Sequence, residues 1–341
     1  MEIQLCKKCG FILNTRPGLG DTDGVCSACI NYEKKKDIDF SARQKWLTQY
    51  IKDNKTNPDY DCLVAVSGGK DSTVIVRKLF EEHEVRKILL VNITDEFTKT
   101  RAGIQNLNNI VEQYNCDLIT FRLNPTKLRT RMLEDLENSL NPLKWLEQEL
   151  YRIPIEIAKR FNIKIAFFGE NSDFEYGSAE DLYIYHKDSD EETKVIFMGA
   201  IHSYEASHWC ELAKEVGFID LNYYNEWQRQ GVLENYSQID SIGYLMGIWT
   251  KFVKFGFARV SDMASRFVRA GLMTYKQAQL LISENDYICD PTSMRDMCRF
   301  LNISEEYFKE LVDKHANTEL VVKDINGVWR RKDYYNNGGG M

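Results

Sequence analysis

The chain has 341 residues and a formal net charge of −7, from 44 Lys and Arg against 51 Asp and Glu. Its hydrophobic fraction of 43% can form a large core, which excludes a disordered chain. The excess of acidic residues argues against a protein whose main task is to bind the phosphate backbone of nucleic acids, so we do not expect a nucleic-acid partner. No apolar run approaches the roughly 18 residues of a membrane helix, and the N-terminus lacks an apolar signal core. We therefore expect a cytoplasmic protein with no membrane partner.

Four of the nine cysteines stand in the first 29 residues, as two C-x2-C pairs with 16 residues between them. Each pair can present two thiolates on a tight turn, and four thiolates complete the tetrahedral shell of Zn²⁺. The pattern therefore predicts a structural zinc site formed by Cys6, Cys9, Cys26 and Cys29. Ordinary thiols or one redox pair are the alternative. The other five cysteines form no short pair and are expected to be small apolar residues: Cys62, Cys116, Cys210, Cys289 and Cys298.

The segment after this cysteine-rich start alternates apolar runs with amphipathic stretches. Four short apolar runs predict buried strands at 61–66, 88–93, 118–123 and 163–168. Helical periodicity predicts helices at 73–83, 101–115, 126–137 and 143–161, the last bent near Pro154. This alternation predicts an α/β fold with a doubly wound parallel sheet. Since ligands of such sheets bind beyond the carboxyl ends of the strands, residues 67–72, 92–95 and 169–171 should share one rim.

The loop Ser67–Ser72 reads SGGKDS and lies between the first predicted strand and the first predicted helix. Its two glycines let the backbone approach a ligand, and free N–H groups at a helix N-terminus form an anion site. A Walker A loop would need Gly in place of Val64 and Ser or Thr in place of Asp71, so a loop for γ-phosphate transfer is excluded. A turn that only caps the helix is the alternative.

SGGKDS resembles the PP-loop of the ATP pyrophosphatases. The resemblance implies that the loop holds the β- and γ-phosphates while ATP is cleaved between its α- and β-phosphates. Lys70 would then neutralise phosphate and Asp71 would hold Mg²⁺, unless Asp71 only faces the helix dipole. We expect the ATP site to comprise Ser67, Gly68, Gly69, Lys70, Asp71, Ser72, Asn92 and Gly169.

Over most of its length the chain is similar to N-acetyl sugar amidotransferases of the WbpG/PseA kind. The segments that carry this resemblance are the cysteine pairs with Thr15–Gly18, the SGGKDS loop, Gly169-Glu170-Asn171, Glu175-Tyr176-Gly177, and the block from Lys254 to Ser265. The chain departs from these relatives at 140–145, where they often have a C-x-x-C-like segment, and at Met263, where they often have His. These two departures bear on which acceptor the protein would use and on how that acceptor would be activated.

The resemblance implies an enzyme, an ATP-dependent C–N ligase that releases AMP and pyrophosphate. It would adenylate the N-acetyl carbonyl of a nucleotide-linked sugar or a nonulosonic acid and replace the oxygen with ammonia, which gives an acetamidino group for lipopolysaccharide or another surface glycan. ATP, Mg²⁺ and Zn²⁺ are the implied cofactors. The implied catalytic residues are Lys70, Asp71, Glu170, Asn171, Arg259 and Asp262.

The chain shows no glutaminase nucleophile, since position 2 is Glu and Cys26 is committed to the cysteine cluster. We therefore expect a separate glutaminase or cyclase-like partner that supplies ammonia. His202 and His208, with aromatic neighbours, are candidates for the sugar site, and a structural role is their alternative. Asp262, Arg266 and Arg269 are spaced to share one helix face, as a surface ion-pair ladder or as part of the site.

We expect three regions: a zinc-binding module of four cysteines over 1–36, a PP-loop ATP-binding α/β domain over 37–172, and a mainly helical substrate or partner region over 173–341. In the last region, an apolar aromatic helix is expected over 239–257 and a hairpin at Asn326-Gly327.

A PP-loop tRNA-modifying ligase of the thiolase type is the alternative function. It would call for a basic RNA face and paired catalytic cysteines, and Cys62 and Cys116 are not so paired. A zinc-organised module that only senses nucleotide is a third hypothesis.

Overall fold

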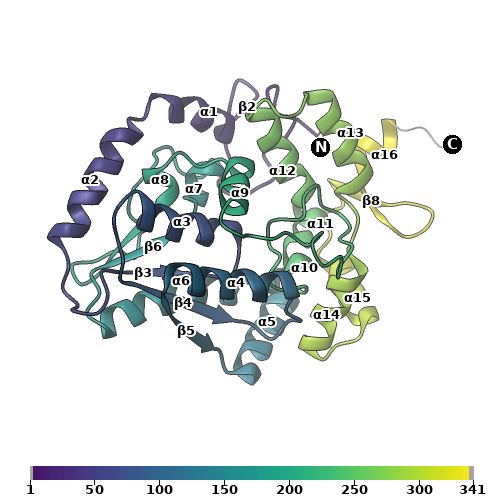
Figure 1. Cartoon of the computed structure of the whole chain (residues 1–341). Coiled ribbons are helices and arrows are strands. Elements are labelled where there is room, and N and C mark those ends of the chain that lie inside the picture. The colour runs from purple at the N-terminus through teal and green to yellow at the C-terminus, as the bar shows by residue number, and fades with distance from the viewer. Residues whose placement is uncertain (1–2, 338–341) are drawn as a thin grey trace.

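The computed structural model describes residues 3–337 and is built around a parallel sheet of five strands (Figure 1). The strands are β3 (Cys62–Ala65), β4 (Ile88–Thr94), β5 (Asp117–Arg122), β6 (Ile165–Phe168) and β7 (Lys194–Phe197). They lie in the order β5-β4-β3-β6-β7, and every neighbouring pair is parallel. The chain builds outward from β3 to β4 and β5, then returns to place β6 on the other side of β3. The predicted doubly wound α/β fold is confirmed.

Alternating residues of the strands belong to two different cores. Side chains along a strand point to opposite faces. Leu63 packs in one core with α5 (Pro125–Ser139) and α6 (Lys144–Arg160). Val64 packs in the other core, among residues of α2 (Phe40–Asp53), α3 (Lys70–Glu81), α4 (Arg101–Tyr114) and α9 (Ala206–Lys214). Helices therefore cover both faces of the sheet, and its carboxyl edge is left for a ligand.

The sheet continues beyond residue 172, where we expected the α/β domain to end. β7 pairs with β6, and α8 (Met198–Ile201) and α9 pack against α2 and α3. Sequence reasoning missed β7 because its short apolar run, 195–198, follows the acidic stretch 187–194. The α/β domain thus reaches at least to α9.

The region after α9 is mainly helical, as predicted. Its elements are α10 (Tyr244–Trp249), α11 (Lys251–Phe255), α12 (Arg259–Arg269), α13 (Tyr275–Asn285), α14 (Pro291–Leu301), α15 (Glu305–His315), the strands β8 (Val321–Lys323) and β9 (Trp329–Arg331), and α16 (Lys332–Asn337). β8 and β9 form an antiparallel pair around Asn326-Gly327. The expectation of one continuous helix over 239–257 is wrong, because α10 begins only at Tyr244 and Gly256, with φ of +75°, ends α11.

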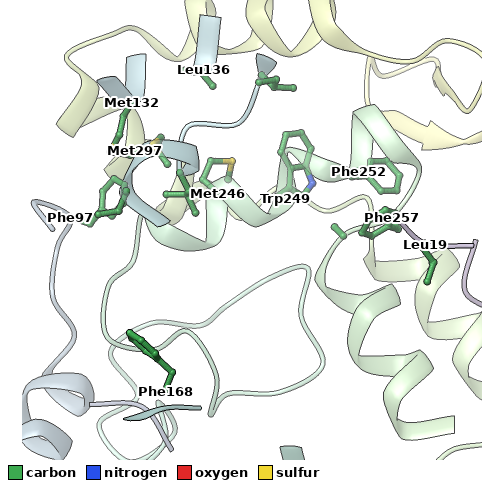
Figure 2. Packing of buried hydrophobic residues seen from close by; sticks show 14 of the residues in the cluster. Leu19, Phe97, Met132, Leu136, Phe168, Met246, Trp249, Phe252, Phe257 and Met297 are labelled. Atoms are coloured by element: carbon green, nitrogen blue, oxygen red, sulfur yellow. The ribbon is translucent and has the colours of Figure 1, made fainter. Parts of the chain in front are cut away.

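The helical region shares its core with the α/β domain. Figure 2 shows Met246 and Trp249 of α10 in the same apolar layer as Met297 of α14 and Met132 of α5. Burial of such side chains contributes roughly 1.5–3 kcal/mol each. The two regions are therefore packed as one body. Among residues 3–337 no helix has both the length and the apolar character of a membrane span.

The amino-terminal segment packs on the helical region. It consists of β1 (Asp21–Thr22), β2 (Val25–Cys26), α1 (Ser27–Lys34) and the short 3₁₀ helix η1 (Lys35–Asp37). The rings of Phe11 and Phe257 lie 4.8 Å apart between centroids, and Figure 2 shows Leu19 beside Phe257. The first residues of the chain thus lie against the start of α12, although most of the sequence separates them.

Candidate active site

A cavity of about 560 Å³ opens at the carboxyl ends of β3 and β6, where the strand order reverses. Ligands of open α/β sheets bind at this switch point, and the volume suits a small-molecule ligand. Its walls come from the loops after β3, β4 and β6, from α6, from the stretch 236–251, from α12 and from the loop between the cysteine pairs. Nine predicted site residues line it: Ser67, Gly69, Lys70, Asp71, Ser72, Gly169, Glu170, Arg259 and Asp262.

The loop after β3 owes its shape to glycine. Gly68 has φ of +84°, and a Cβ there would come within 2.4 Å of the carbonyl oxygen of Gly103. Only glycine combines this conformation with such close packing. Gly69 precedes the first turn of α3, and no side chain caps that helix. The first N–H groups of α3 therefore remain available to an anion in the cavity.

Lys70 and Asp71 are held in different ways on the first turn of α3. The Lys70 side chain is only 3% exposed; its Nζ lies 2.6 Å from Asp71 Oδ1 and donates to the Tyr204 hydroxyl at 3.1 Å. The Asp71 side chain is 36% exposed. Mg²⁺ takes one or two carboxylates together with phosphate oxygens and water. Asp71 therefore fits a magnesium ligand toward bound phosphates.

Glu170, after β6, forms an ion pair with Arg266 of α12. Arg266 Nη1 lies 3.0 Å from Glu170 Oε2. Burial alone would raise the pKa of Glu170, but the charges of Arg266 and Lys70 lower it below the ordinary value. The Nε and Nη2 atoms of Arg266 are buried without a hydrogen-bond partner among the described residues. Since an unpaired buried donor costs about 1–3 kcal/mol, these atoms are suited to a ligand.

Arg259 and Asp262 stand on the first turn of α12. Arg259 lies against Glu234, with Nη2 at 2.9 Å and Nε at 3.0 Å from Oε1. Burial would lower the pKa of Arg259, but Glu234 raises it, so the guanidinium is charged. Asp262 is 4% exposed, and its Oδ1 has no hydrogen-bond partner among the described residues. Asp286 of the following segment accepts hydrogen bonds from the amides of Ala258 and Ser261 and fixes this turn.

Arg16 and Tyr176 complete this wall, and we did not predict either as a site residue. The Arg16 guanidinium lies 4.1 Å and that of Arg266 4.5 Å from the centroid of the Tyr176 ring. Arg16 Nη1 is 3.7 Å from Asp262 Oδ1, which is longer than a hydrogen bond. Both residues belong to segments quoted above for the family resemblance. The family resemblance could therefore have pointed to Arg16 and Tyr176 as site residues, but it did not indicate what either residue does.

Three predicted site residues do not line the cavity: Gly68, Asn92 and Asn171. Gly68 shapes the loop after β3, and the two asparagines make hydrogen bonds beside the cavity. Asn171 donates to the carbonyl of Tyr183 at 3.0 Å and caps α7 (Ser172–Glu175) by accepting from the amide of Phe174. Asn92 donates to the carbonyl of Val66 at 2.9 Å, which fixes the start of the SGGKDS loop. Both side chains position the rim, and their predicted direct roles in catalysis and ATP binding remain predictions.

The two candidate histidines do not line the cavity. His202 is buried against His83, with their Nε2 atoms 2.9 Å apart. Burial lowers the pKa of both imidazoles, for His83 to about 4 and for His202 to about 2. His208 is largely exposed on α9. The pair His83–His202 is therefore a packed link between the ends of α3 and α8.

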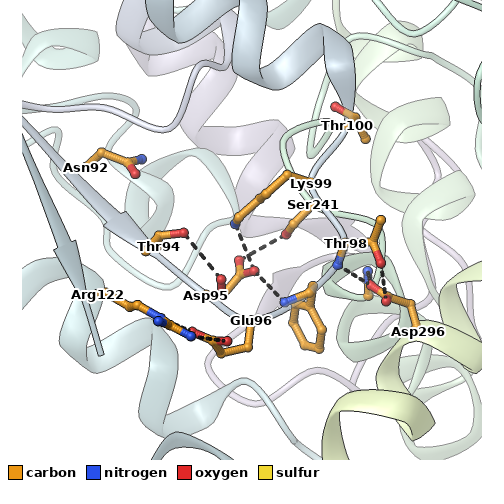
Figure 3. A network of polar contacts seen from close by, with 12 residues as sticks. Asn92, Thr94, Asp95, Glu96, Thr98, Lys99, Thr100, Arg122, Ser241 and Asp296 are labelled. Atoms are coloured by element: carbon orange, nitrogen blue, oxygen red, sulfur yellow. Dashed lines mark hydrogen bonds and ion pairs between the residues drawn. The ribbon is translucent and has the colours of Figure 1, made fainter. Parts of the chain in front are cut away.

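The end of β4 is tied to the helical region by a polar network, shown in Figure 3. Asp95 accepts from Lys99 at 2.8 Å and from Ser241 at 3.0 Å. Thr98 donates twice to Asp296 of α14, from its amide at 2.8 Å and from its hydroxyl at 2.6 Å. Asp95 and the neighbouring Asp240 line the cavity. This part of the cavity thus has acidic side chains together with apolar ones, which are Val91, Ile93, Leu146, Leu150, Pro154 and Phe168.

The four amino-terminal cysteines form one buried cluster, as predicted. Their sulfur atoms all lie within 4.8 Å of one another, with 3.8 Å between Cys6 and Cys29 and 3.7 Å between Cys9 and Cys26. Four thiolates bound at about 2.3 Å around a tetrahedral Zn²⁺ are separated by about 3.8 Å. No disulfide joins them. Arg269, at the end of α12, approaches Cys9 Sγ at 3.7 Å, so the donor set fits Zn²⁺ with a cation beside it.

The sheet order, the SGGKDS loop at its switch point and the four-cysteine cluster define an α/β protein of the PP-loop type with an amino-terminal cluster of four cysteines that could hold a metal ion. Residues 230–333 match the family model described as the C-terminal domain of WbpG-like LPS biosynthesis proteins. This part of the chain is therefore similar to the C-terminal domain of those proteins, which confirms the resemblance stated for this part of the sequence. Arg259, Asp262 and Arg266 all lie in the matched segment.

Two further comparisons found more distant similarity. The chain is 19% identical over 257 residues to the uncharacterized protein MJ1599 of Methanocaldococcus jannaschii, over 75% of this chain and 84% of that protein. An NH3-dependent NAD synthetase from Campylobacter jejuni is 12% identical, with a TM-score of 0.37, over 57% of this chain and 80% of its own. An NMN synthetase from Francisella tularensis is 12% identical, with a TM-score of 0.35, over 78% of this chain and 94% of its own. The fold assignment rests on the sheet itself.

Proposed function

We propose that this protein is an ATP-dependent C–N ligase that converts the N-acetyl group of a sugar into an acetamidino group, with release of AMP and pyrophosphate. One observation carries the proposal. The SGGKDS loop and the first turn of the WbpG-like α12 line the same cavity of about 560 Å³. A loop suited to phosphate thereby lies next to a buried carboxylate and several arginines, the charged groups that activation of an amide requires.

In the first half-reaction, the carbonyl oxygen of the N-acetyl group attacks the α-phosphorus of ATP, and the bond to the β-phosphate breaks. The N-terminal amides of α3 and the Lys70 ammonium face the charge that develops on the departing pyrophosphate. Mg²⁺ bound at Asp71 would neutralise the same phosphates. The product is an O-adenylyl imidate, in which AMP has become a good leaving group.

In the second half-reaction, ammonia attacks the imidate carbon, the C–O bond breaks, and AMP departs with the former carbonyl oxygen. The attacking nitrogen must lose a proton. We assign this role to Asp262, and its buried Oδ1, which has no hydrogen-bond partner among the described residues, supports the assignment. Arg266, with two unpaired donor atoms, can stabilise the phosphate of the leaving AMP. The ion pair with Arg266 keeps Glu170 ionised, in accord with the lowered pKa of that carboxyl.

The test is the release of AMP and pyrophosphate from ATP with a panel of UDP- and CMP-linked N-acetyl sugars and ammonium. A sugar labelled with ¹⁸O at the acetyl carbonyl should deliver the label to AMP. Asp71→Asn should lower AMP formation at least about 100-fold, whereas the exposed Asp53→Asn on α2 should leave it unchanged. Release of ADP, or ¹⁸O retained in the sugar, would contradict the proposed chemistry.

The same measurement separates the tRNA-modifying alternative. AMP formation that requires tRNA would favour that alternative. Burial raises the pKa of Cys62 far above its ordinary value and that of Cys116 to about 11, which keeps both thiols protonated and unreactive. These two cysteines are therefore poorly suited to supply the nucleophilic thiol that sulfur transfer needs.

We further propose that a separate glutaminase or cyclase-like partner supplies the ammonia and that the reaction takes place in the cytoplasm, where ATP is available. Turnover by the purified chain with ammonium but not with glutamine supports the need for a partner. Efficient glutamine-dependent turnover by the chain alone would contradict it.

A further inference from the structure

We propose that Arg16, on the loop between the two cysteine pairs, binds an anionic group of the acceptor sugar, a carboxylate or a phosphate. The cysteine module, residues 3–36, would then be part of the substrate site and not only a structural cap. This inference rests on the proposed function for the identity of the acceptor. Its support comes from the contacts of Arg16 and from the order in which charged groups follow one another along the cavity wall.

The guanidinium of Arg16 makes no carboxylate pair within hydrogen-bond distance, in contrast to those of Arg259 and Arg266, since its Nη1 stays 3.7 Å from Asp262 Oδ1. Arg259 is paired with Glu234, and Arg266 with Glu170. The Arg16 guanidinium makes no hydrogen bond to any residue between 3 and 337, and its side chain is 23% exposed where it lines the cavity. The Arg16 guanidinium carbon lies 4.1 Å from the centroid of the Tyr176 ring, a contact that occupies none of its N–H donors. Such a group suits the bidentate recognition of an oxyanion.

The position of Arg16 separates its anion from the phosphates of ATP. The series of contacts begins at Asp71, whose Cβ would lie 3.4 Å from a Cβ placed on Gly169. Glu170 follows Gly169 and pairs with Arg266 at 3.0 Å. Arg266 and Arg16 both lie over the Tyr176 ring. Because this series of contacts links Asp71 to Arg16 only through Glu170, Arg266 and Tyr176, we assign an anion at Arg16 to the acceptor and the phosphates of ATP to the SGGKDS loop.

The cysteine module fixes both sides of this contact. Asn31 of α1 donates to the carbonyls of Phe174 at 2.8 Å and Ala179 at 2.7 Å, on either side of Tyr176. Lys35 pairs with Glu175 at 2.7 Å. Gly177, with φ of +85°, packs so closely on α1 that a Cβ would come within 2.5 Å of the Ala28 amide nitrogen. The segment that holds Tyr176 is therefore clamped to the same module that carries Arg16.

The experiment compares Arg16→Met and Arg16→Lys with Lys8→Met, which removes an exposed cation from the same module. Arg16→Met should raise KM for the acceptor about 30- to 100-fold while KM for ATP changes less than about 3-fold. Arg16→Lys should recover only part of the affinity for the acceptor, because lysine restores the positive charge but not the planar set of N–H donors of a guanidinium. Lys8→Met should match the wild type. A rise in KM for ATP with an unchanged acceptor KM would overturn the assignment to the acceptor.

Two acceptors identify the anion. UDP-N-acetylglucosamine and its uronic acid differ only at C6, where the uronic acid has a carboxylate in place of the hydroxymethyl group. If Arg16 binds the carboxylate, Arg16→Met weakens the binding of the uronic acid only. If Arg16 binds the nucleotide phosphates, Arg16→Met weakens the binding of both nucleotide sugars equally and leaves the binding of a phosphate-free N-acetyl sugar unchanged. Equal affinity of Arg16→Met and wild type for both nucleotide sugars overturns the inference.

Calorimetric binding of these sugars without ATP keeps the inference independent of turnover. Loss of binding in Arg16→Met, at unchanged zinc content and melting temperature, supports it even if no N-acetyl sugar yields AMP, an outcome that would contradict only the proposed reaction. Turnover with an Arg16→Met variant that binds the acceptor normally would contradict only the role of Arg16.

Discussion

The two sides of the cavity are built by different means. The sheet side consists of the loops after β3, β4 and β6, whose positions follow from strand ends, a helix N-terminus and backbone hydrogen bonds. The arginine side is held in place by side-chain pairs, and its members are Arg16, Tyr176, Arg259, Asp262 and Arg266. Contacts of α12 connect residues up to 260 positions apart, as between Arg269 and Cys9. One side depends on local backbone geometry, and the other on the assembly of the whole chain.

This difference predicts different responses to mutation. A change in backbone space on the sheet side should abolish phosphate binding while the rest of the molecule stays folded. A change to Arg259 or Arg266 on the arginine side should reduce stability together with activity, because each of these buried charges depends on its partner. The four predictions below test this contrast, from the largest expected effect to the smallest.

Gly68→Ala should have the largest effect. The added methyl group would meet the carbonyl oxygen of Gly103 at 2.4 Å, so the loop must move away from its ligand. We expect AMP formation to fall at least about 100-fold, because a misplacement of about 1 Å lowers the rates of other enzymes by a similar factor. Gly327→Ala is the matched control, since its φ of +75° is similar but no atom lies within 4 Å of the new Cβ. It should cost about 1 kcal/mol of stability and no activity. A fully active Gly68→Ala enzyme would refute the role of the loop.

Arg259→Met should destabilise the protein by about 3 kcal/mol, because it leaves the Glu234 side chain, 3% exposed, without its cation. The double variant Glu234→Gln, Arg259→Met should recover most of this loss, and chemical denaturation would measure both. Arg131→Met breaks an exposed pair with Glu134 and should change stability by less than about 0.5 kcal/mol. Equal losses in Arg259→Met and Arg131→Met would contradict the contrast between the two sides.

Asp240, on the stretch 236–251 that lines the cavity next to the end of β4, gives the protein a pH-dependent stability. Burial raises the pKa of its carboxyl to about 6, above the value near about 3.9 of an unfolded chain. The folded state therefore binds more protons between these values, and stability falls as the pH rises from about 4 to about 6. Asp240→Asn should remove this part of the slope and raise stability at about pH 7 by about 1–2 kcal/mol, with little change at about pH 4. Parallel stability curves for wild type and Asp240→Asn would contradict the prediction.

Asn92→Ala should have the smallest effect. It removes one hydrogen bond to the Val66 carbonyl, which corresponds to about 1 kcal/mol of stability. KM for ATP, measured by steady-state kinetics, should change less than about 3-fold if Asn92 only holds the loop. A rise of more than about 10-fold would instead support the direct contact with ATP that we predicted from the sequence.

The sequence predicted most of the sheet side and little of the arginine side. β3 to β6 and the helices between them follow from local hydrophobic patterns, and the SGGKDS loop and the cysteine pairs follow from short motifs. Arg266 was singled out by its spacing from Asp262, but its partner Glu170 lies 96 residues away on another element. No local pattern encodes such a pair. The same holds for Arg16 and Tyr176, which meet only because α1 clamps the segment after β6.

The omission of β7 from the predicted sheet has a related cause. Four apolar residues after an acidic stretch carry too little periodicity to identify a strand, and only pairing with β6 makes them one. The break at Thr250 between α10 and α11 and the late start at Tyr244 were missed because nothing in this apolar run marks them; only the end of α11 has a local signal, Gly256.

The contact between Arg269 and Cys9 also sets the order of events during synthesis. These residues are 260 positions apart, and at about 5–20 residues per second the ribosome needs roughly 10–50 s to add the second after the first. A nascent chain that already holds the cysteine pairs and the SGGKDS loop still lacks the arginine side until α12 emerges. Under the proposed function, Asp262 and Arg266, which we assign to the consumption of ATP, are therefore added after the loop that we assign to its phosphates.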